Sequence, residues 1–304
     1  MISRIADSVR FGAMAENVAN LQGGMSRASE QLSTQKKINQ PADDPAGAKA
    51  VLNLRTAGAA IDQYQANIAG AQTRLKATEL TLTSINDLLK QAQGVAQTAA
   101  GTSAPSRSDT ADLLQSISDQ VRSLANTQLD GRHLFSGAMT GTQPFPDSTS
   151  GYQGDRQTPL INIGSNQSAA SNITGDAVFT FPAAGGGVDD IFKSLDSLIE
   201  TLRDPAANST DVSQALASFN DTSSQVQGQV QENIIKTDAM TGNFEFANNH
   251  LTYLKDRIGS MISKTEDADV AKLAMEFQMH ALALNASYTV ASKMNEGSIL
   301  NLLQ

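Results

Sequence analysis

A heptad repeat near the start of the chain is the feature that most limits what this sequence can fold into. Apolar residues recur every seven positions, and a second, mostly small set follows three places after each of them. The first set is Leu54, Ile61, Ile68, Leu75, Leu82, Leu89 and Ala96, and the second is Ala57, Tyr64, Ala71, Thr78, Ile85, Ala92 and Ala99. The spacing predicts one helix of about 55 residues and about 80 Å. The small second set allows close approach of a neighbouring helix.

Each end of the chain carries a shorter apolar seam with the 3–4 spacing of a coiled coil. Towards the N-terminus the seam is Phe11, Met14, Val18, Leu21, Met25, Ala28 and Leu32. Towards the C-terminus it is Val270, Ala274, Phe277, Ala281, Leu284, Tyr288 and Ala291. Only 5% of residues are aromatic and none is Trp, so the chain has few large side chains to cover these helices. Because an exposed apolar stripe favours association, we expect both seams to pack against other molecules.

The middle of the chain has a different character. A helix after Pro105 is expected to bury Leu113, Ile117, Val121 and Leu124. Helical periodicity then disappears, and two β-prone segments, Leu160–Ile163 and Ala177–Phe181, predict short strands. Helical patterns resume at Ile191, and a second long helix is expected over about residues 209–262. The predicted fold is mainly α: an elongated coiled-coil helix bundle with paired terminal helices and a small β-rich insertion domain.

This layout divides the chain into five parts. An inner domain is expected to consist of an N-terminal helix in residues 1–40 and a C-terminal helix in residues 265–304. A long-helix bundle is expected to have its first half in residues 41–130 and its second half in residues 189–264. The outer β-rich insertion is expected to occupy residues 131–188. Asp44 and Pro45 are typical of a helix cap followed by the first helical residue, because the carboxylate accepts an unpaired N–H and proline lacks one. Thr265–Asp267 is expected to open the last helix, since acidic residues suit a first turn.

Composition and motifs argue against several classes of function. With 22 basic and 31 acidic residues the net charge is −9, whereas a nucleic-acid partner requires a basic surface. There is no Cys, the three His are far apart, and no calcium loop, phosphate loop or catalytic triad is recognisable. We therefore expect no enzyme, no metal and no cofactor. Charges interrupt the first apolar segment and no apolar run approaches about 20 residues, so neither a secretory signal nor a membrane partner is expected.

Several segments resemble the flagellin family. Leu32–Gly47 is similar to the family signature between the first two helices, and Ala268–Leu303 is similar to its C-terminal helix with an apolar tail. Within the family, four segments resemble the members at the junction of hook and filament and differ from filament flagellins: Leu129–Gly137, Pro144–Phe145, Gly151–Asp155 and Gly175–Phe179. One departure is His133, where an aromatic residue such as Tyr is expected.

The resemblance implies an extracellular structural subunit of the bacterial flagellum that adapts the hook to the filament and is exported by the flagellar type III apparatus without a cleaved signal peptide. It implies four partners: the first hook-associated junction protein, flagellin, identical subunits in a ring, and a cytoplasmic chaperone that binds the C-terminal region. The expected assembly interface is Phe11, Met14, Val18, Leu21, Met25, Leu32, Val270, Phe277, Leu284, Tyr288 and Leu302. A filament-forming flagellin is the alternative, because it shares both ends. An enzyme would need a convergent polar site in the insertion.

Overall fold

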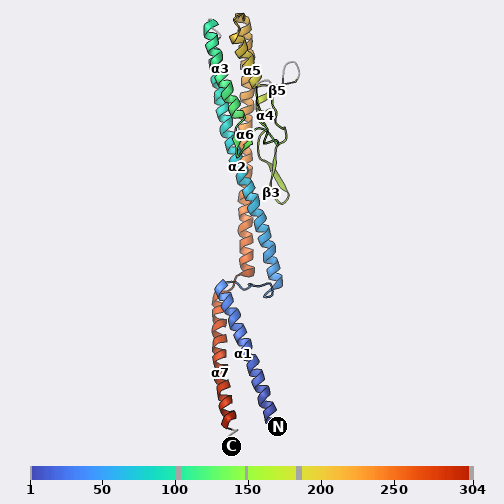
Figure 1. Cartoon of the computed structure of the whole chain (residues 1–304), viewed down its shortest axis with the longest axis vertical. Coiled ribbons are helices and arrows are strands. Elements are labelled where there is room, and N and C mark those ends of the chain that lie inside the picture. The colour runs from blue at the N-terminus through green and yellow to red at the C-terminus, as the bar shows by residue number, and fades with distance from the viewer. Residues whose placement is uncertain (1, 100–103, 148–149, 183–186, 301–304) are drawn as a thin grey trace. The chain divides into compact units, whose positions relative to one another are not determined.

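The computed structural model describes residues 2–99, 104–147, 150–182 and 187–300, which form seven helices and six short strands (Figure 1). The chain divides into two compact units, one made of Met1–Ala60 with Tyr253–Gln304 and the other of Ile61–Thr252. The two long helices, α2 (Pro45–Ala99) and α6 (Ser209–Glu266), contribute to both units. The prediction of a mainly α fold with a small β-rich insertion is confirmed.

In the first unit, α1 (Ile2–Thr34) packs along α7 (Val270–Leu300) in the antiparallel direction (Figure 1). The residues that meet establish the direction. The Gln22 amide donates to the Tyr288 hydroxyl at 2.9 Å, whereas Gln35, just after α1, accepts from the Ala268 N–H at 3.0 Å. The two end helices therefore lie together, as the sequence predicts.

The second unit is built on four helices: α2, α3 (Ala104–Ala125), α5 (Ile191–Arg203) and α6. On α2, every first-set heptad position of this unit, from Ile61 to Ala96, is buried. Most of the second set is buried too, and Thr78 satisfies its hydroxyl by donating to the Arg74 carbonyl at 3.0 Å. The predicted heptad helix is therefore correct, and its seam forms the middle of a closed core.

The insertion consists of three separate antiparallel hairpins and one short helix. The hairpins pair β1 (Gln128–Leu129) with β2 (Arg132–His133), β3 (Leu160–Gly164) with β4 (Gln167–Ala170), and β5 (Thr180–Pro182) with β6 (Val188–Asp190), and the helix is α4 (Gly175–Phe179). Because each sheet has only two strands, side-chain packing must supply most of the stability of the insertion.

An aromatic cluster provides that packing. Phe135, Phe145, Phe179 and Phe192 are all fully buried, and the ring of Phe145 lies 5.2 Å from that of Phe179 and 5.0 Å from that of Phe192. The side chain of Asn126 holds Phe145 in place, since its amide donates to the Phe145 carbonyl at 2.7 Å and its oxygen accepts the Phe145 N–H at 2.9 Å. Four of the ten Phe rings of the chain are thus gathered where the insertion joins α5.

Three local predictions are wrong. Ala177–Phe179 belongs to α4 rather than to a strand, because a single helical turn places both Val178 and Phe179 in the core. On α3, Leu113 is 58% exposed and its neighbour Leu114 is buried instead. Thr265–Asp267 does not open the last helix: α6 continues to Glu266, and α7 begins at Val270 after Asp269, whose carboxylate accepts the Lys272 N–H at 3.1 Å.

Candidate assembly interface

The predicted N-terminal seam lies along α1 on the side that faces α7. Its middle residues are half-buried, namely Met14, Val18, Leu21, Met25 and Leu32, and Ala28 between them is buried. Phe11, near the start of the helix, is 40% exposed. Part of this seam is therefore covered within the molecule, and its covering weakens towards the chain end.

The predicted C-terminal seam is placed in the same way along α7. Phe277 and Leu284 are half-buried beside α1, whereas Val270 and Tyr288 are 46% and 48% exposed. Leu302 lies outside the described residues. The structure thus brings the two seams together as a pair, and two helices alone leave most of the seam side chains partly accessible.

One glycine determines how closely the pair packs. A Cβ at Gly24 would lie 2.9 Å from the His280 ring, which is closer than real contacts of this kind, whereas a Cβ at the preceding Gly23 would meet nothing within 4 Å. The ring of His280 therefore occupies the space that a side chain at position 24 would fill.

An apolar stripe on the other face of α7 is a feature that the sequence reasoning missed. It consists of Met275, Met279, Leu282 and Val290, which are 60%, 70%, 73% and 52% exposed. Their spacing of four, three and eight residues repeats with the helix, so the signal was present in the sequence. It was hidden because almost every face of this helix carries Ala, Leu or Met. The helix pair consequently exposes apolar side chains on a face that α1 does not cover.

An ion-pair cluster lies where α1 ends and α7 begins, between the linkers that follow α1 and α6. The Glu266 carboxylate, from the end of α6, is 7% exposed and lies 2.9 Å from Lys36 Nζ and 2.8 Å from Arg55 Nη2. The hydrogen bond from Lys36, helped by Arg55, lowers the pKa of Glu266 below its ordinary 4.5. In the backbone, the Lys37 N–H donates to the Glu266 carbonyl at 2.8 Å. This cluster connects the linker after α1 with α2 and the end of α6.

The predicted cap residues lie in the linker next to this cluster. Asp44 Oδ1 accepts the N–H groups of Ala46 and Gly47 at 3.1 and 2.9 Å, and Pro45 is the first residue of α2. Asp43 closes the preceding turn, because its Oδ2 accepts the N–H groups of Asn39 and Gln40 at 2.9 and 2.8 Å. These backbone hydrogen bonds lower the pKa of Asp43. Both carboxylates therefore act on the backbone of the linker.

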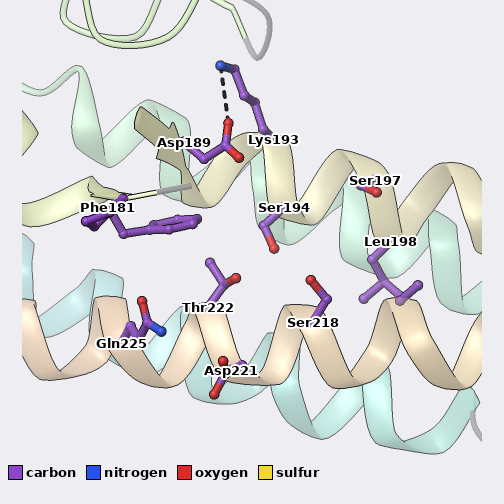
Figure 2. A pocket seen from close by; sticks show the side chains of 12 residues that line it. Phe181, Asp189, Lys193, Ser194, Ser197, Leu198, Ser218, Asp221, Thr222 and Gln225 are labelled. Carbon is purple, nitrogen blue, oxygen red and sulfur yellow. Dashed lines mark ion pairs between the residues drawn. The ribbon is translucent and has the colours of Figure 1, made fainter. Parts of the chain in front are cut away.

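A polar groove of about 480 Å³ lies between α5, α6 and the β5–β6 hairpin (Figure 2). Lys193 pairs with Asp189 at 3.7 Å, and Figure 2 shows its amine turned away from the Ser194 hydroxyl, which points towards α6. The groove contains no His, and nowhere among the described residues do three or more His, Cys, Asp or Glu side chains gather as a metal site. Nor is any described helix long and apolar enough to cross a membrane.

His133, which stands where the family resemblance leads us to expect an aromatic residue, lies in the β1–β2 hairpin. Its ring is buried, with Nδ1 at 2.9 Å from the Asn126 carbonyl and Nε2 at 2.9 Å from the Gln128 side-chain nitrogen. A neutral ring that donates from Nδ1 and accepts at Nε2 satisfies both contacts. His133 therefore fixes the local backbone of the insertion.

Comparison with known proteins gives a consistent set of relatives. Residues 8–140 match the bacterial flagellin N-terminal helical region. The flagellar hook-associated protein 3 of Salmonella typhimurium is 26% identical, and that of Escherichia coli 27%, each over 98% of this chain and 99% of its own length. A solved structure from Vibrio parahaemolyticus, of a candidate flagellar hook-associated protein, has a TM-score of 0.66 at 23% identity and covers 74% of this chain and 100% of that one. It shares the fold of this chain.

Proposed function

We propose that this chain, which resembles flagellar hook-associated protein 3 along almost its whole length, is a structural subunit of the flagellum at the junction of hook and filament. The family resemblance predicted from Leu32–Gly47 is confirmed, because the matching region includes that segment. In this proposal the chain acts by packing its end helices against neighbouring subunits, and it needs no catalytic step.

One observation carries the proposal: the helix pair of α1 and α7 is apolar both along its half-covered seam and on the outward face of α7. Met279 and Leu282 on that face are 70% and 73% exposed. A run of large exposed apolar side chains of this kind marks a surface used for association. The interface we propose therefore combines the predicted seam residues with the outward stripe of Met275, Met279, Leu282 and Val290.

The partners follow from the position at the junction. We propose that the helix pair contacts the first hook-associated junction protein on one side and flagellin on the other, and that identical subunits form a ring. A cytoplasmic chaperone would cover the apolar C-terminal region before export through the flagellar type III apparatus without a cleaved signal peptide. On this view residues 1–40 and 265–304 form the inner domain, residues 41–130 and 189–264 the bundle, and residues 131–188 the outer insertion.

Aspartate substitutions on α7 test the proposal. Leu282→Asp should leave the stability of the free chain within about 0.5 kcal/mol, because the side chain is 73% exposed, yet prevent filaments from attaching to hooks. Leu284→Asp on the half-buried seam should prevent attachment and also loosen the helix pair. Asn285→Asp is the matched control, since it adds the same charge at an exposed polar position of α7. Attachment can be scored by electron microscopy, and normal filaments on Leu282→Asp cells would contradict the proposal.

The filament-forming flagellin is distinguished by a separate measurement. A junction subunit should not polymerise alone into long filaments, whereas a filament subunit should do so when seeded. Purified chain that elongates hook fragments without added flagellin would favour the alternative.

A further inference from the structure

A cationic cleft lies in the second unit. Its volume is about 570 Å³, and it is lined by the middle of α2, the turn between β1 and β2, and the start of β3. The turn belongs to the segment Leu129–Gly137, which the proposed function leaves without a role. The cleft is therefore built from residues that the end-helix interface does not use.

Two arginines from different elements line this cleft. Arg74 projects from α2 and is half-buried, and Arg132 follows the tight turn of Asp130 and Gly131, whose φ angles are 51° and 72°. These positive angles are those of the tight hairpin turn that Asp-Gly favours, so the backbone fixes the position of Arg132. The arrangement places two guanidinium groups at one opening.

Neither guanidinium group is paired within the described part of the chain. No ion pair or side-chain hydrogen bond is formed there by Arg74 or Arg132. The charge of Asp130 at the turn raises the pKa of Arg74, but by less than burial and the charge of Arg132 lower it. Burial, together with the charge of Arg132, lowers the pKa of Arg74, which is the response expected when two cations share a poorly solvated space. A carboxylate between the two guanidinium groups would relieve this repulsion and accept hydrogen bonds from both.

Asn172 also lines the cleft, but its side chain is not open to a bound segment. The residue is 1% exposed, its amide nitrogen donates to the Gly137 carbonyl at 3.4 Å, and its side-chain oxygen is shielded from solvent. The two arginines are therefore the groups of the cleft that can meet a charged partner. On the α2 side, a Cβ at Gly70 would meet nothing within 4 Å, so the helix surface there is open.

We infer that this cleft receives an acidic side chain, Asp or Glu, from a second copy of the chain in the assembled ring. The inference rests on the proposed function, which brings copies together. The charge of the chain supports a second copy as the occupant, since 31 acidic residues against 22 basic ones make neighbouring copies repel each other overall. A cationic cleft gives one point of attraction, which would fix the register between copies.

The test is the double variant Arg74→Gln/Arg132→Gln. The fraction of hooks with filaments should fall on the order of tenfold, because a charge contact between subunits is lost. The unfolding midpoint of the free chain should not fall, because the two guanidinium groups repel each other and neither has a side-chain pair to lose. Lys76→Gln is the control: it removes one positive charge from the same helix, outside the cleft, where Lys76 pairs with Glu79. Filament attachment by the double variant at the wild-type level would overturn the inference.

A cross-linking experiment identifies the occupant. Arg132→Lys places an amine in the cleft, and carbodiimide treatment of isolated junctions should join it to a carboxylate of a second copy. Mass spectrometry should find the linked peptide from Arg132→Lys junctions and not from Arg132→Gln junctions. If the linked carboxylate belonged to another protein, or no link formed, a second copy would not be the occupant.

Titration with sulfate tests whether the cleft binds a small free anion instead. Saturable stabilisation of the wild-type chain by sulfate, absent in the double variant and accompanied by normal filament attachment, would assign the cleft to small anions and overturn the inference. Leu282→Asp separates the two proposals. If that variant prevents attachment while the double arginine variant does not, the cleft inference fails and the proposed function stands; if neither prevents attachment, both fail.

Discussion

The bundle of the second unit and the helix pair of the first both rest on heptad seams, but these seams are covered to different extents. On α2, Leu82, Ile85 and Leu89 are 0% exposed, because α3, α5 and α6 supply further helices to the same core. On α1 and α7, Ala28 is buried, but the other described seam residues are half-buried or exposed. The difference shows that the seam pattern alone does not determine burial; the number of helices around it does.

The same contrast appears along a single helix. The heptad positions of α2 are buried from Ile61 onwards, whereas Leu54 is half-buried and Ala57 is exposed in the part that belongs to the first unit. A two-helix layer covers one side of each helix and leaves the rest accessible. We therefore expect the bundle to be stable by itself and the helix pair to depend on added partners.

The largest expected effect comes from truncating the core of the bundle. Phe179→Ala should lower the free energy of unfolding by about 3–5 kcal/mol, because a fully buried ring in contact with Phe135 and Phe145 is lost. Phe246→Ala should change it by less than about 0.5 kcal/mol, since that ring is 77% exposed. Urea unfolding followed by circular dichroism measures both. Equal losses at the two positions would mean that the core of the second unit has been misidentified.

The same kind of substitution in the helix pair of the first unit allows the two units to be compared. Phe277→Ala should cost only about 1–2 kcal/mol, because the half-buried ring has less area to lose. The cost should appear as faster hydrogen exchange in α7 while exchange in α3 is unchanged. A loss as large as that of Phe179→Ala would show that the helix pair already has a closed core.

The next effect tests the Glu266 cluster at the end of the helix pair. Glu266→Gln should destabilise the first unit by about 1–2 kcal/mol at neutral pH, which is less than for a fully buried pair, because the Lys36 and Arg55 side chains are 41% and 53% exposed. Hydrogen exchange of the amides of α7 is a suitable measurement. Glu30→Gln is the control, since Glu30 is an exposed carboxylate on α1.

The pH dependence of this variant has a definite sign. Since the pKa of Glu266 is lower in the folded chain than its ordinary 4.5, the stabilisation is complete above that value and is lost as the pH falls through the lowered pKa. The difference between wild type and Glu266→Gln should therefore be constant from pH 7 to about pH 5 and shrink below it. A difference that grew on acidification would show that the charged carboxylate destabilises the linkers.

Much of the helical architecture was predictable because it repeats locally. The seven-residue spacing from Leu54 to Ala96 predicted the length of α2, its positions from Ile61 onwards predicted the buried face, and Asp44 with Pro45 marked its start. The β-rich insertion was recognisable in outline, from its loss of helical periodicity. In α4, however, burial of both Val178 and Phe179 outweighed a strand-like local pattern.

The features that could not be predicted depend on residues distant in sequence or on a choice between similar faces. Glu266 and Arg55 are 211 positions apart, and nothing in the local sequence of either points to the other. On α7, two faces have apolar side chains at helical spacing, and only the position of α1 shows that Leu284 faces inward while Leu282 faces outward. The unpaired arginines of the cleft became visible only when the hairpin was placed against α2.

The smallest expected effect uses two adjacent glycines to measure how tightly the helix pair packs. Gly23→Ala should stabilise α1 by about 0.5–1 kcal/mol, because alanine is the better helix former and the space beside it is empty. Gly24→Ala should lose that gain and become destabilising, because its Cβ would meet the His280 ring at 2.9 Å. Adding His280→Ala to Gly24→Ala should restore the gain, a coupling that two independent sites would not show. Exchange of the α1 amides reports all three variants. If Gly24→Ala stabilised α1 as much as Gly23→Ala does, α7 would not pack closely at this point in the free chain, and the pair would form only when neighbouring subunits hold it together.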